Sequence, residues 1–304
     1  LTLPKGDTAQ RGRGRGLVAG GSAPTNNNGI EFINIQSQGN SIEFGDLAVA
    51  GQQAGASSST RALFGMGGQA SPGTKQNVIQ FVTIATTGNA TDFGDRTVTL
   101  NGPGGLANQT RAVFAGGGAP VPQSNVMDFV TIASAGNAQD FGDMTSANKN
   151  PAGMASPTRG LFVHGGDPKT NVIDFITIAT AGNAQDFGDT TVAMEGAIAA
   201  SSTTRGIIGG GLVSPAEINN IMFITIATTG NATDFGDLTQ ARQEGAGISN
   251  SIRACFASGG VPSAYNTIDF VTIATRGDAL DFGDLIGGAN FVVVGTSDSH
   301  GGLS

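Results

Sequence analysis

The stretch GNATDFGD at residues 88–95 decides the fold, because the chain carries a version of it six times. The phenylalanines of the six Phe-Gly-Asp copies are Phe44, Phe93, Phe141, Phe187, Phe235 and Phe282. The steps between them are 49, 48, 46, 48 and 47 residues. Such a constant period indicates a repeat architecture, in which each repeat is one supersecondary unit.

Each repeat contains four pieces with the pattern of a short β-strand. In the second repeat they are GASSST (55–60), RALFGMGG (61–68), NVIQFVTIAT (77–86) and ATDFGDRT (90–97). The third piece is apolar on both faces and rich in β-branched residues, which predicts a strand buried on both sides. TTGN (86–89) supplies hairpin turn residues between the third and fourth pieces. The repeat therefore predicts a four-stranded antiparallel sheet.

The two ends of the chain distinguish an open solenoid from a closed ring. Arg15–Gly21 matches a second strand with no first strand before it, whereas Phe291–Leu303 matches a first strand and the start of a second. A solenoid needs polar caps, while a ring needs its two ends to complete one blade. We therefore predict an all-β fold, a six-bladed β-propeller closed by pairing of the C-terminal strand with the N-terminal blade.

The whole chain, residues 1–304, is expected to form this single propeller domain. Its first blade, residues 15–47, would be completed by residues 286–304. The other five blades are expected at residues 55–97, 105–145, 153–191, 199–239 and 247–285.

The phenylalanines follow the same period. Sixteen of the 17 stand at three repeat positions, namely the second strand, the third strand and the Phe-Gly-Asp motif, and only Phe291 stands apart. Aromatic residues at so regular a spacing are expected to pack blade against blade in the core.

The order of these pieces resembles a known repeat family. A Gly-Gly pair after the second strand, then a third strand, a turn, an aromatic strand and an Arg resembles the kelch repeat over nearly the whole chain. The chain departs from that family in having no Trp and in carrying Phe where kelch blades carry Tyr or Trp. DFGDLT together with GNA and SSxTR also resembles repeats in structural proteins of tailed bacteriophages, particularly those infecting cyanobacteria. The first resemblance implies the propeller, and the second implies a structural role in a virion.

Composition argues against two classes of partner. The net charge of −8 speaks against nucleic acid, because phosphate binding needs a basic face. The only basic cluster, RGRGRG at residues 11–16, is better explained as a terminal strand with its turn. No apolar run reaches the ~18 residues of a membrane span, so no membrane insertion is expected. Because the chain begins at Leu1 without Met, we expect a processed chain or part of a longer polypeptide.

Two charged residues recur in every repeat. The second Asp of the motif and the Arg that opens the second strand are Asp46, Asp95, Asp143, Asp189, Asp237, Asp284, Arg15, Arg61, Arg111, Arg159, Arg205 and Arg253. We predict that each Asp binds an Arg and that these pairs fasten neighbouring strands or blades. The alternative is calcium held by Asn89, Asp92 and Asp95 and their equivalents. It is weakened because acidic residues at positions i and i+3 of a strand point to opposite faces. We expect no metal and no other cofactor.

Signals for catalysis are weak. Asp-Phe-Gly is also the tripeptide of the kinase metal-binding loop, but the sequence lacks the catalytic and nucleotide loops that accompany it in kinases. His164 and His300, the only histidines, stand at second-strand positions of the repeat. The lone Cys255 stands where other repeats have Leu or Val, so it is expected to be buried. We therefore expect a protein that is not an enzyme.

Sequence variation gathers in one set of connections. The turns between first and second strands and between third and fourth strands repeat almost unchanged, whereas the second-to-third loops and the crossings between blades diverge. In an up-and-down blade the divergent segments share one face, as expected for a recognition surface or for drift in unconstrained loops. The candidate binding residues there are Tyr265, Lys169, Glu217 and Arg242, with Tyr265 first as an aromatic anchor.

The leading interpretation is a non-enzymatic structural or adhesion protein of a phage virion, on a fibre, the tail or a capsid appendage. Its partners would be other virion proteins or a glycan or receptor of the host surface, its location the virion or the extracellular space, and a homo-oligomer fits this role. The alternative is a secreted or cell-surface carbohydrate-binding propeller of bacterial origin. A glycan-cleaving propeller is disfavoured, because no convergent catalytic set is visible.

Overall fold

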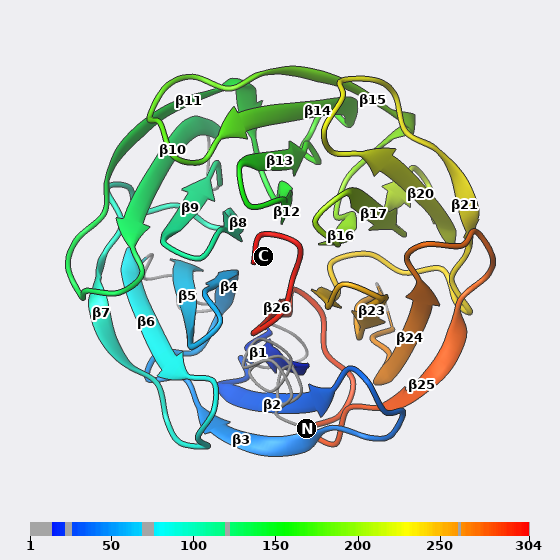
Figure 1. Cartoon of the computed structure of the whole chain (residues 1–304), viewed down its shortest axis with the longest axis horizontal. Coiled ribbons are helices and arrows are strands. Elements are labelled where there is room, and N and C mark those ends of the chain that lie inside the picture. The colour runs from blue at the N-terminus through cyan, green and yellow to red at the C-terminus, as the bar shows by residue number, and fades with distance from the viewer. Residues whose placement is uncertain (1–13, 22–25, 69–75, 119–121, 261–262, 304) are drawn as a thin grey trace, which may run out of the picture.

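The chain forms a ring of six four-stranded antiparallel sheets around a central axis in the computed structural model (Figure 1). The predicted six-bladed β-propeller is therefore confirmed. The structure describes residues 14–21, 26–68, 76–118, 122–260 and 263–303. In this part of the chain no helix is long and apolar enough to cross a membrane. Arg11 and Arg13 of the basic run lie outside the described residues.

In each blade the first strand lies nearest the axis and the fourth forms the rim (Figure 1). Blade 1 consists of β26 (Val294–Ser297), β1 (Arg15–Ala19), β2 (Gly29–Asn34) and β3 (Ile42–Asp46). Blade 2 consists of β4 (Gln52–Ser57), β5 (Arg61–Gly68), β6 (Val78–Thr83) and β7 (Thr91–Asp95). Blade 3 consists of β8 (Gly104–Ala107), β9 (Arg111–Ala115), β10 (Ser124–Thr131) and β11 (Gln139–Asn148).

Blade 4 consists of β12 (Ala152–Ala155), β13 (Arg159–Val163), β14 (Thr170–Thr177) and β15 (Gln185–Met194). Blade 5 consists of β16 (Ile198–Ser201), β17 (Arg205–Gly209), β20 (Asn220–Thr225) and β21 (Thr233–Asp237), with a small hairpin of β18 (Leu212–Val213) and β19 (Ala216–Glu217). Blade 6 consists of β22 (Ala246–Ser249), β23 (Arg253–Ala257), β24 (Thr267–Thr272) and β25 (Leu280–Asp284).

The ring closes where the two ends of the chain meet. β26 pairs with β1 in antiparallel register, from Gly16 opposite Ser297 to Ala19 opposite Val294. Asp298 Oδ1 accepts the backbone N–H groups of Gly14 and Arg15, at 2.8 and 3.2 Å. In the other blades, a continuous turn joins the first strand to the second and is capped by a side chain. In blade 1 the equivalent cap forms between the two ends of the chain.

The end of the chain differs from the expectation in one respect. Phe291–Leu303 was expected to contain a first strand and the start of a second, but only residues 294–297 form a strand. Residues 298–302 form turns and a bend, because β1 already occupies the second-strand place beside β26. Gly301 N–H donates to the carbonyl of Ser201 at 2.9 Å. The C-terminal turn therefore lies across the ring from β26, at the inner strands of other blades.

The core lies between neighbouring blades. One buried cluster joins Leu17 and Phe44 of blade 1 to Phe64 and Ile84 of blade 2, and equivalent clusters join the other blades. The motif Phe of each blade meets the third-strand Phe edge-on, with ring centroids 5.7–6.2 Å apart. The expected role of the phenylalanines in blade packing is confirmed, although five of the six third-strand rings are only half-buried.

The GNA turn of each blade covers the outer edge of the preceding blade. Gly88 and Ala90 donate backbone N–H groups to the carbonyls of Phe44 and Asp46, at 2.8 and 2.7 Å. Asn89 Oδ1 in turn accepts the N–H of Asp46 at 3.0 Å. Gly45 has φ +153°, and a Cβ on it would lie 2.4 Å from the carbonyl oxygen of Gly88. The motif Gly therefore lets two backbones touch, and the exposed sheet edge is protected.

The same closeness is found around the axis. A Cβ on Gly153 of β12 would lie 2.1 Å from the carbonyl oxygen of Gly105 of β8, and similar contacts recur between other first strands. Small residues at this position allow the six first strands to surround a narrow central cavity.

Candidate functional site

Strand direction gives the disc two different faces. The end of each first strand and the start of each second strand share one face, as in the pairing of Ala155 with Gly160. The start of each first strand and the end of each second strand share the other, as in the pairing of Ala152 with Val163. We call the first the Arg face, because every repeat Arg opens a second strand there. We call the second the loop face, because the second-to-third loops leave from it.

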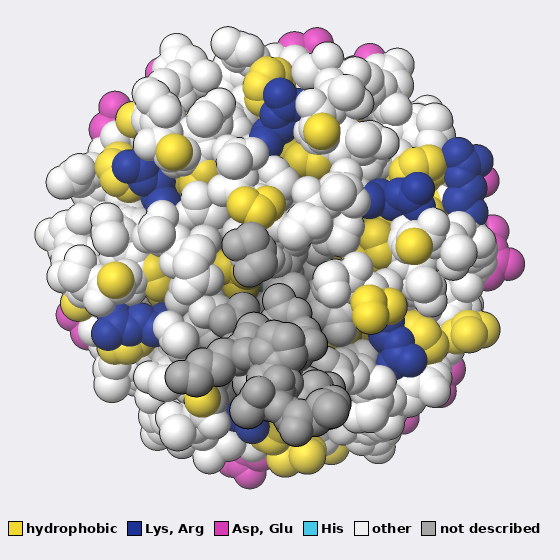
Figure 2. All heavy atoms as spheres, in the orientation of Figure 1, with side chains coloured by type: hydrophobic (Ala, Val, Ile, Leu, Met, Phe, Trp, Pro, Cys, Tyr) yellow, Lys and Arg dark blue, Asp and Glu magenta, His cyan; other side chains and the backbone are white. Residues whose placement is uncertain are grey.

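The repeat arginines connect neighbouring blades on the Arg face. Arg61 Nη1 donates to the carbonyls of Ile132 and Ala133 in the next blade, at 3.0 and 2.9 Å. Its guanidinium carbon lies 5.0 Å from the ring centroid of Phe81 in its own blade. The six Arg equivalents donate to the carbonyls of Ile84, Ile132, Ile178, Ile226, Ile273 and Ile35. Figure 2 shows this face, where basic side chains recur around the disc beside apolar ones.

The predicted pairing of repeat Asp with repeat Arg is wrong. Among the described residues, the ion pairs are Arg96–Asp128, His164–Asp174, Lys169–Glu195 and Arg242–Asp269. The reason is strand direction. In blade 2, Asp95 lies opposite Val78 at the start of β6, whereas Arg61 lies opposite Thr83 at its end. At about 3.3 Å per residue, the two charges are held near opposite faces of the disc.

A different carboxylate links the blades closer to the loop face. The third-strand residues at this position are Glu31, Gln80, Asp128, Asp174, Met222 and Asp269. Asp128 accepts the backbone N–H and the hydroxyl of Thr97 in the preceding blade, at 2.9 Å each. Asp174 with Thr145 and Asp269 with Thr239 repeat this arrangement. We call these three contacts the Asp–Thr latches.

Each latch carboxylate is buried, and each has its own basic side chain beside it. Arg96 lies 3.1 Å from Asp128, His164 lies 2.8 Å from Asp174, and Arg242 lies 3.1 Å from Asp269. These basic residues come from unrelated repeat positions. Blade 2 has the neutral Gln80 and blade 5 the apolar Met222 at the latch position. A basic side chain is therefore present beside each of the three fully buried latch carboxylates, where an unpartnered charge would be costly.

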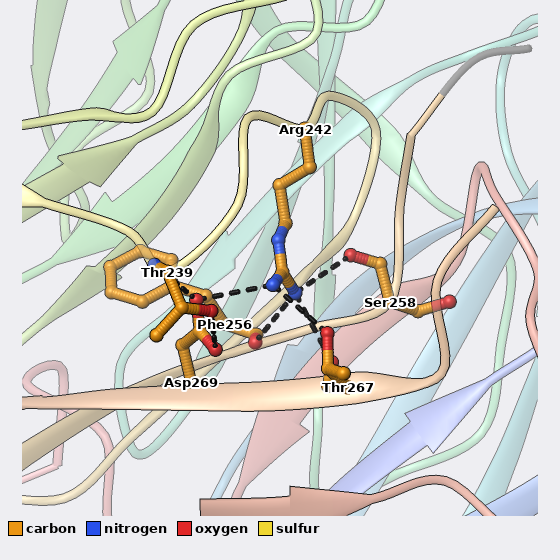
Figure 3. Close-up of polar contacts among 6 residues, drawn as sticks. All are labelled: Thr239, Arg242, Phe256, Ser258, Thr267 and Asp269. Carbon is orange, nitrogen blue, oxygen red and sulfur yellow. Dashed lines mark hydrogen bonds and ion pairs between the residues drawn. The ribbon is translucent and has the colours of Figure 1, made fainter. Parts of the chain in front are cut away.

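Arg242 belongs to this buried system, so its predicted role as an exposed binding residue is wrong. Its side chain is fully buried. Nη1 donates to the carbonyls of Phe256, Ser258 and Thr267, and Nη2 to Thr267 Oγ1 and to Asp269 (Figure 3). Burial lowers the pKa of Arg242, an effect that Asp269 opposes. The crossing that carries Arg242 folds inward to supply this charge.

His164 forms a chain of contacts that resembles a catalytic triad. Ser146 Oγ lies 3.3 Å from His164 Nδ1, and His164 Nε2 lies 2.8 Å from Asp174 Oδ2. Asp174 also holds Thr145, as the other latches do. Since arginines fill the same place beside Asp128 and Asp269, the geometry assigns His164 the role of a buried partner of the latch carboxylate.

The central cavity extends along the axis between the two ends of the first strands. Its volume is about 150 Å³, and its wall is formed by the six first strands and the residues that enter them. One repeat position, five residues before the end of each first strand, lies at the loop-face end of the cavity. Its residues are Gln52, Gly102, Asn150, Gly196, Glu244 and Val292, of which the last five line the cavity. We call this position the mouth.

The mouth is held by backbone contacts and carries one cross-ring side-chain contact. Asn150 N–H donates to Gly102 carbonyl, and Glu244 N–H to Gly196 carbonyl, at 2.8 Å each. Asn150 Nδ2 donates to Glu244 Oε1 at 2.9 Å. Burial raises the pKa of Glu244, helped by Glu195 and Glu217 and opposed by Lys149 and by the Asn150 bond. Glu244 and Val292 both have positive φ, +56° and +58°. Positive φ is uncommon for residues other than Gly and is rare for a β-branched residue such as Val292.

The floor of the cavity lies at the Arg face. Ser57, Ser201, Ser249 and Ser297 end their first strands, and each hydroxyl donates to the carbonyl at the same position of the preceding blade. His300 Nε2 lies 2.8 Å from the carbonyl oxygen of Ser57, and Gly302 N–H donates to His300 Nδ1 at 3.1 Å. Burial lowers the pKa of His300 to about 4. The neutral imidazole fits because it offers one donor and one acceptor.

The other three predicted binding residues do lie on the loop face. Lys169 is half-buried and pairs with Glu195 at 3.0 Å. Glu217 lies in the β18–β19 hairpin and acts electrostatically on Glu244. Tyr265 is half-buried, with its ring 5.8 Å from the Arg242 guanidinium carbon. The three belong to different blades, and parts of four neighbouring loops (residues 22–25, 69–75, 119–121 and 261–262) lie outside the described residues.

Metal and thiol chemistry find little support in the described residues. There, no three His, Cys, Asp or Glu side chains gather into a group that could hold a metal. In the alternative calcium cluster, Asn89 Oδ1 is already used to cap Asp46. Cys255 is buried, as expected, and burial raises its pKa to about 12. The thiol is therefore an apolar core group.

Sequence reasoning missed the residues that define the mouth. Asn150 and Glu244 occupy a position where two other repeats have Gly, and this substitution was the only signal available. No protein-family model and no curated protein matches this chain. The fold is compatible with a structural or a binding role.

Proposed function

We propose that this protein is a non-enzymatic structural or adhesion component of a phage virion and that its loop face contacts the host surface or another virion protein. The observation that carries the proposal is that the Arg face is the same in every repeat whereas the loop face differs from repeat to repeat. Every repeat uses the same Arg contacts on one face, whereas the segments of the other face share neither length nor sequence. A rigid scaffold that presents divergent loops suits recognition.

The virion assignment rests on the likeness of the DFGD and GNA repeats to structural proteins of tailed phages. The structure supplies a physical reason why such repeats suit a particle exposed to the environment. The GNA turn protects the outer sheet edge, and the pairing of β26 with β1 leaves no free edge at the seam. Protected edges limit unwanted association of exposed sheets.

Location on the particle is the first test. Antibodies against the purified propeller should label intact particles at a constant place, and electron microscopy should count a fixed number of copies. Labelling of host cell surfaces in the absence of phage would instead favour the secreted or cell-surface carbohydrate-binding propeller. Absence of label from particles would refute the virion assignment.

Binding through the loop face is the second test. The fluorescent propeller is incubated with cyanobacterial host cells and with a glycan array. Tyr265→Ala and Lys169→Ala should reduce binding severalfold. Gln109→Ala is the matched control, because Gln109 is exposed on the Arg face and bonds only Ser59 there. Equal losses for the two faces would show that the loops do not carry recognition.

A further inference from the structure

We propose that the central cavity is a binding site for a small linear organic cation with primary ammonium groups, held beside the mouth residues Asn150 and Glu244. The cavity of about 150 Å³ is a separate site from the outer loops, so this inference does not depend on the virion role. A cavity of this size accommodates a small molecule or several waters.

Two side chains that line the cavity each have a buried amide oxygen without a partner, Gln53 next to the mouth and Asn150 within it. Gln53 is 7 % exposed and lines the cavity, and its Oε1 has no hydrogen-bond partner, while its Nε2 donates to the carbonyl of Val49. Asn150 Oδ1 is likewise buried without a partner, while its Nδ2 donates to Glu244. In both cases the amide nitrogen is already used, so the orphaned atom is the oxygen. Such oxygens favour a ligand rich in N–H or O–H donors.

Glu244 adds the charge that selects a cation among donors. Its Oε1 accepts the Asn150 bond, and among the described residues no partner of Oε2 is found. The charged groups around it are Lys149, Glu195 and Glu217, with Lys169 paired to Glu195. The carboxylates of Glu244, Glu195 and Glu217 are therefore accompanied by only two ammonium groups, those of Lys149 and Lys169. Burial raises the pKa of Glu244, and a bound cation would offset the cost of burying its charge, which supports the same choice.

The shape of the wall limits the ligand. Gly102, Gly196 and the first-strand glycines line the cavity, and a Cβ on each would meet atoms of a neighbouring blade, so the first strands pack closely around a small space. A cavity of about 150 Å³ accommodates a thin chain better than a bulky ring. We therefore choose 1,4-diaminobutane as the probe and 1,4-butanediol as its neutral counterpart of similar length.

The experiment is calorimetric titration of the full chain with each probe at pH 7. Saturable one-to-one binding of the diamine is expected, weakened about tenfold or more in Glu244→Gln, since one charged hydrogen bond is lost. Glu217→Gln is the matched control: it removes the same charge from the hairpin outside the cavity and should change affinity less than threefold. Repeating the titration at lower pH should show weaker binding, because protonation of Glu244 removes the charge that attracts the cation.

Three results would overturn the proposal. The first is no saturable binding of the diamine. The second is equal weakening by Glu244→Gln and Glu217→Gln, which would mean general attraction to an acidic surface. The third is equal binding of the diol and the diamine. Thermal unfolding of Glu244→Gln confirms that the variant is folded, and its stability should match or exceed that of the natural chain because a buried carboxylate is removed.

Discussion

The Arg face and the loop face are built from the same six repeats, yet they use charge in opposite ways. On the Arg face all six guanidinium groups repeat one contact, a carbonyl of the next blade and a Phe ring of their own. Toward the loop face, three buried carboxylates are partnered by basic side chains from unrelated positions. The difference teaches that the repeated residues are the same in every blade where they join neighbouring blades on the Arg face. Toward the loop face, each buried carboxylate has a partner that is specific to its blade.

The largest loss of stability is expected at an Asp–Thr latch, where each blade supplies its own basic side chain. Asp269→Ala leaves Arg242 buried without its carboxylate, so the free energy of unfolding should fall by about 3–5 kcal/mol. Urea unfolding measures this loss. The control replaces both residues by Met, which imitates Met222 of blade 5 and should restore most of the stability. A double variant as unstable as Asp269→Ala would show that the latch matters for more than its charge balance.

The second-largest effect is a pH-dependent loss of stability that involves His300 at the cavity floor. Neutral His300 has a folded-state pKa of about 4, below the value of 6.5 for the free side chain. Between these values the unfolded chain binds the proton and the folded chain does not. Stability from His300 is therefore complete above pH 6.5 and decreases as the pH falls toward 4, by up to about 3 kcal/mol.

Unfolding curves of the natural chain and His300→Gln at pH 7, 5 and 4 test this expectation. The natural chain should lose more stability than the variant, because the variant lacks the titrating group while all carboxylates are shared. Parallel pH dependence in the two proteins would contradict it.

The third effect tests whether the repeated contact of the Arg face is structural. Arg159→Leu removes donors from the carbonyls of Ile226 and Ala227 and the cation from the ring of Phe175. The free energy of unfolding should fall by about 2 kcal/mol. Arg159→Lys should recover part of it, because an ammonium group reaches fewer acceptors at once. An unchanged melting temperature for Arg159→Leu would refute the blade-linking role.

The smallest loss of stability is expected for a half-buried ion pair of the loop face. Lys169→Ala breaks the half-buried contact with Glu195 and should cost less than about 1 kcal/mol. Differential scanning calorimetry beside Arg159→Leu gives the comparison directly. If Lys169→Ala proved as costly as Arg159→Leu, the loop face would be part of the scaffold rather than a tolerant surface.

The site was harder to predict than the fold because its members come together only across the ring. Tyr265, Lys169 and Glu217 were placed on the correct face from loop divergence alone, whereas Arg242 in the same kind of segment folds inward to Asp269. Asn150 and Glu244 stand 94 residues apart and meet only because blades 4 and 6 both face the axis. A period in the sequence carries no information about which side chain crosses the mouth.

The sequence by itself determined the number of blades, the strand order within each blade and the closure of the ring, because a short period and complementary chain ends leave few ways to bury the repeated apolar strands. The tertiary structure alone decided which charges meet. Recurrence suggested that Asp46 and its equivalents bind the repeat arginines, yet antiparallel strands carry these groups to opposite faces, and each Arg reaches a carbonyl of the next blade instead. Partners of this kind depend on directions in space, which spacing along a chain does not contain.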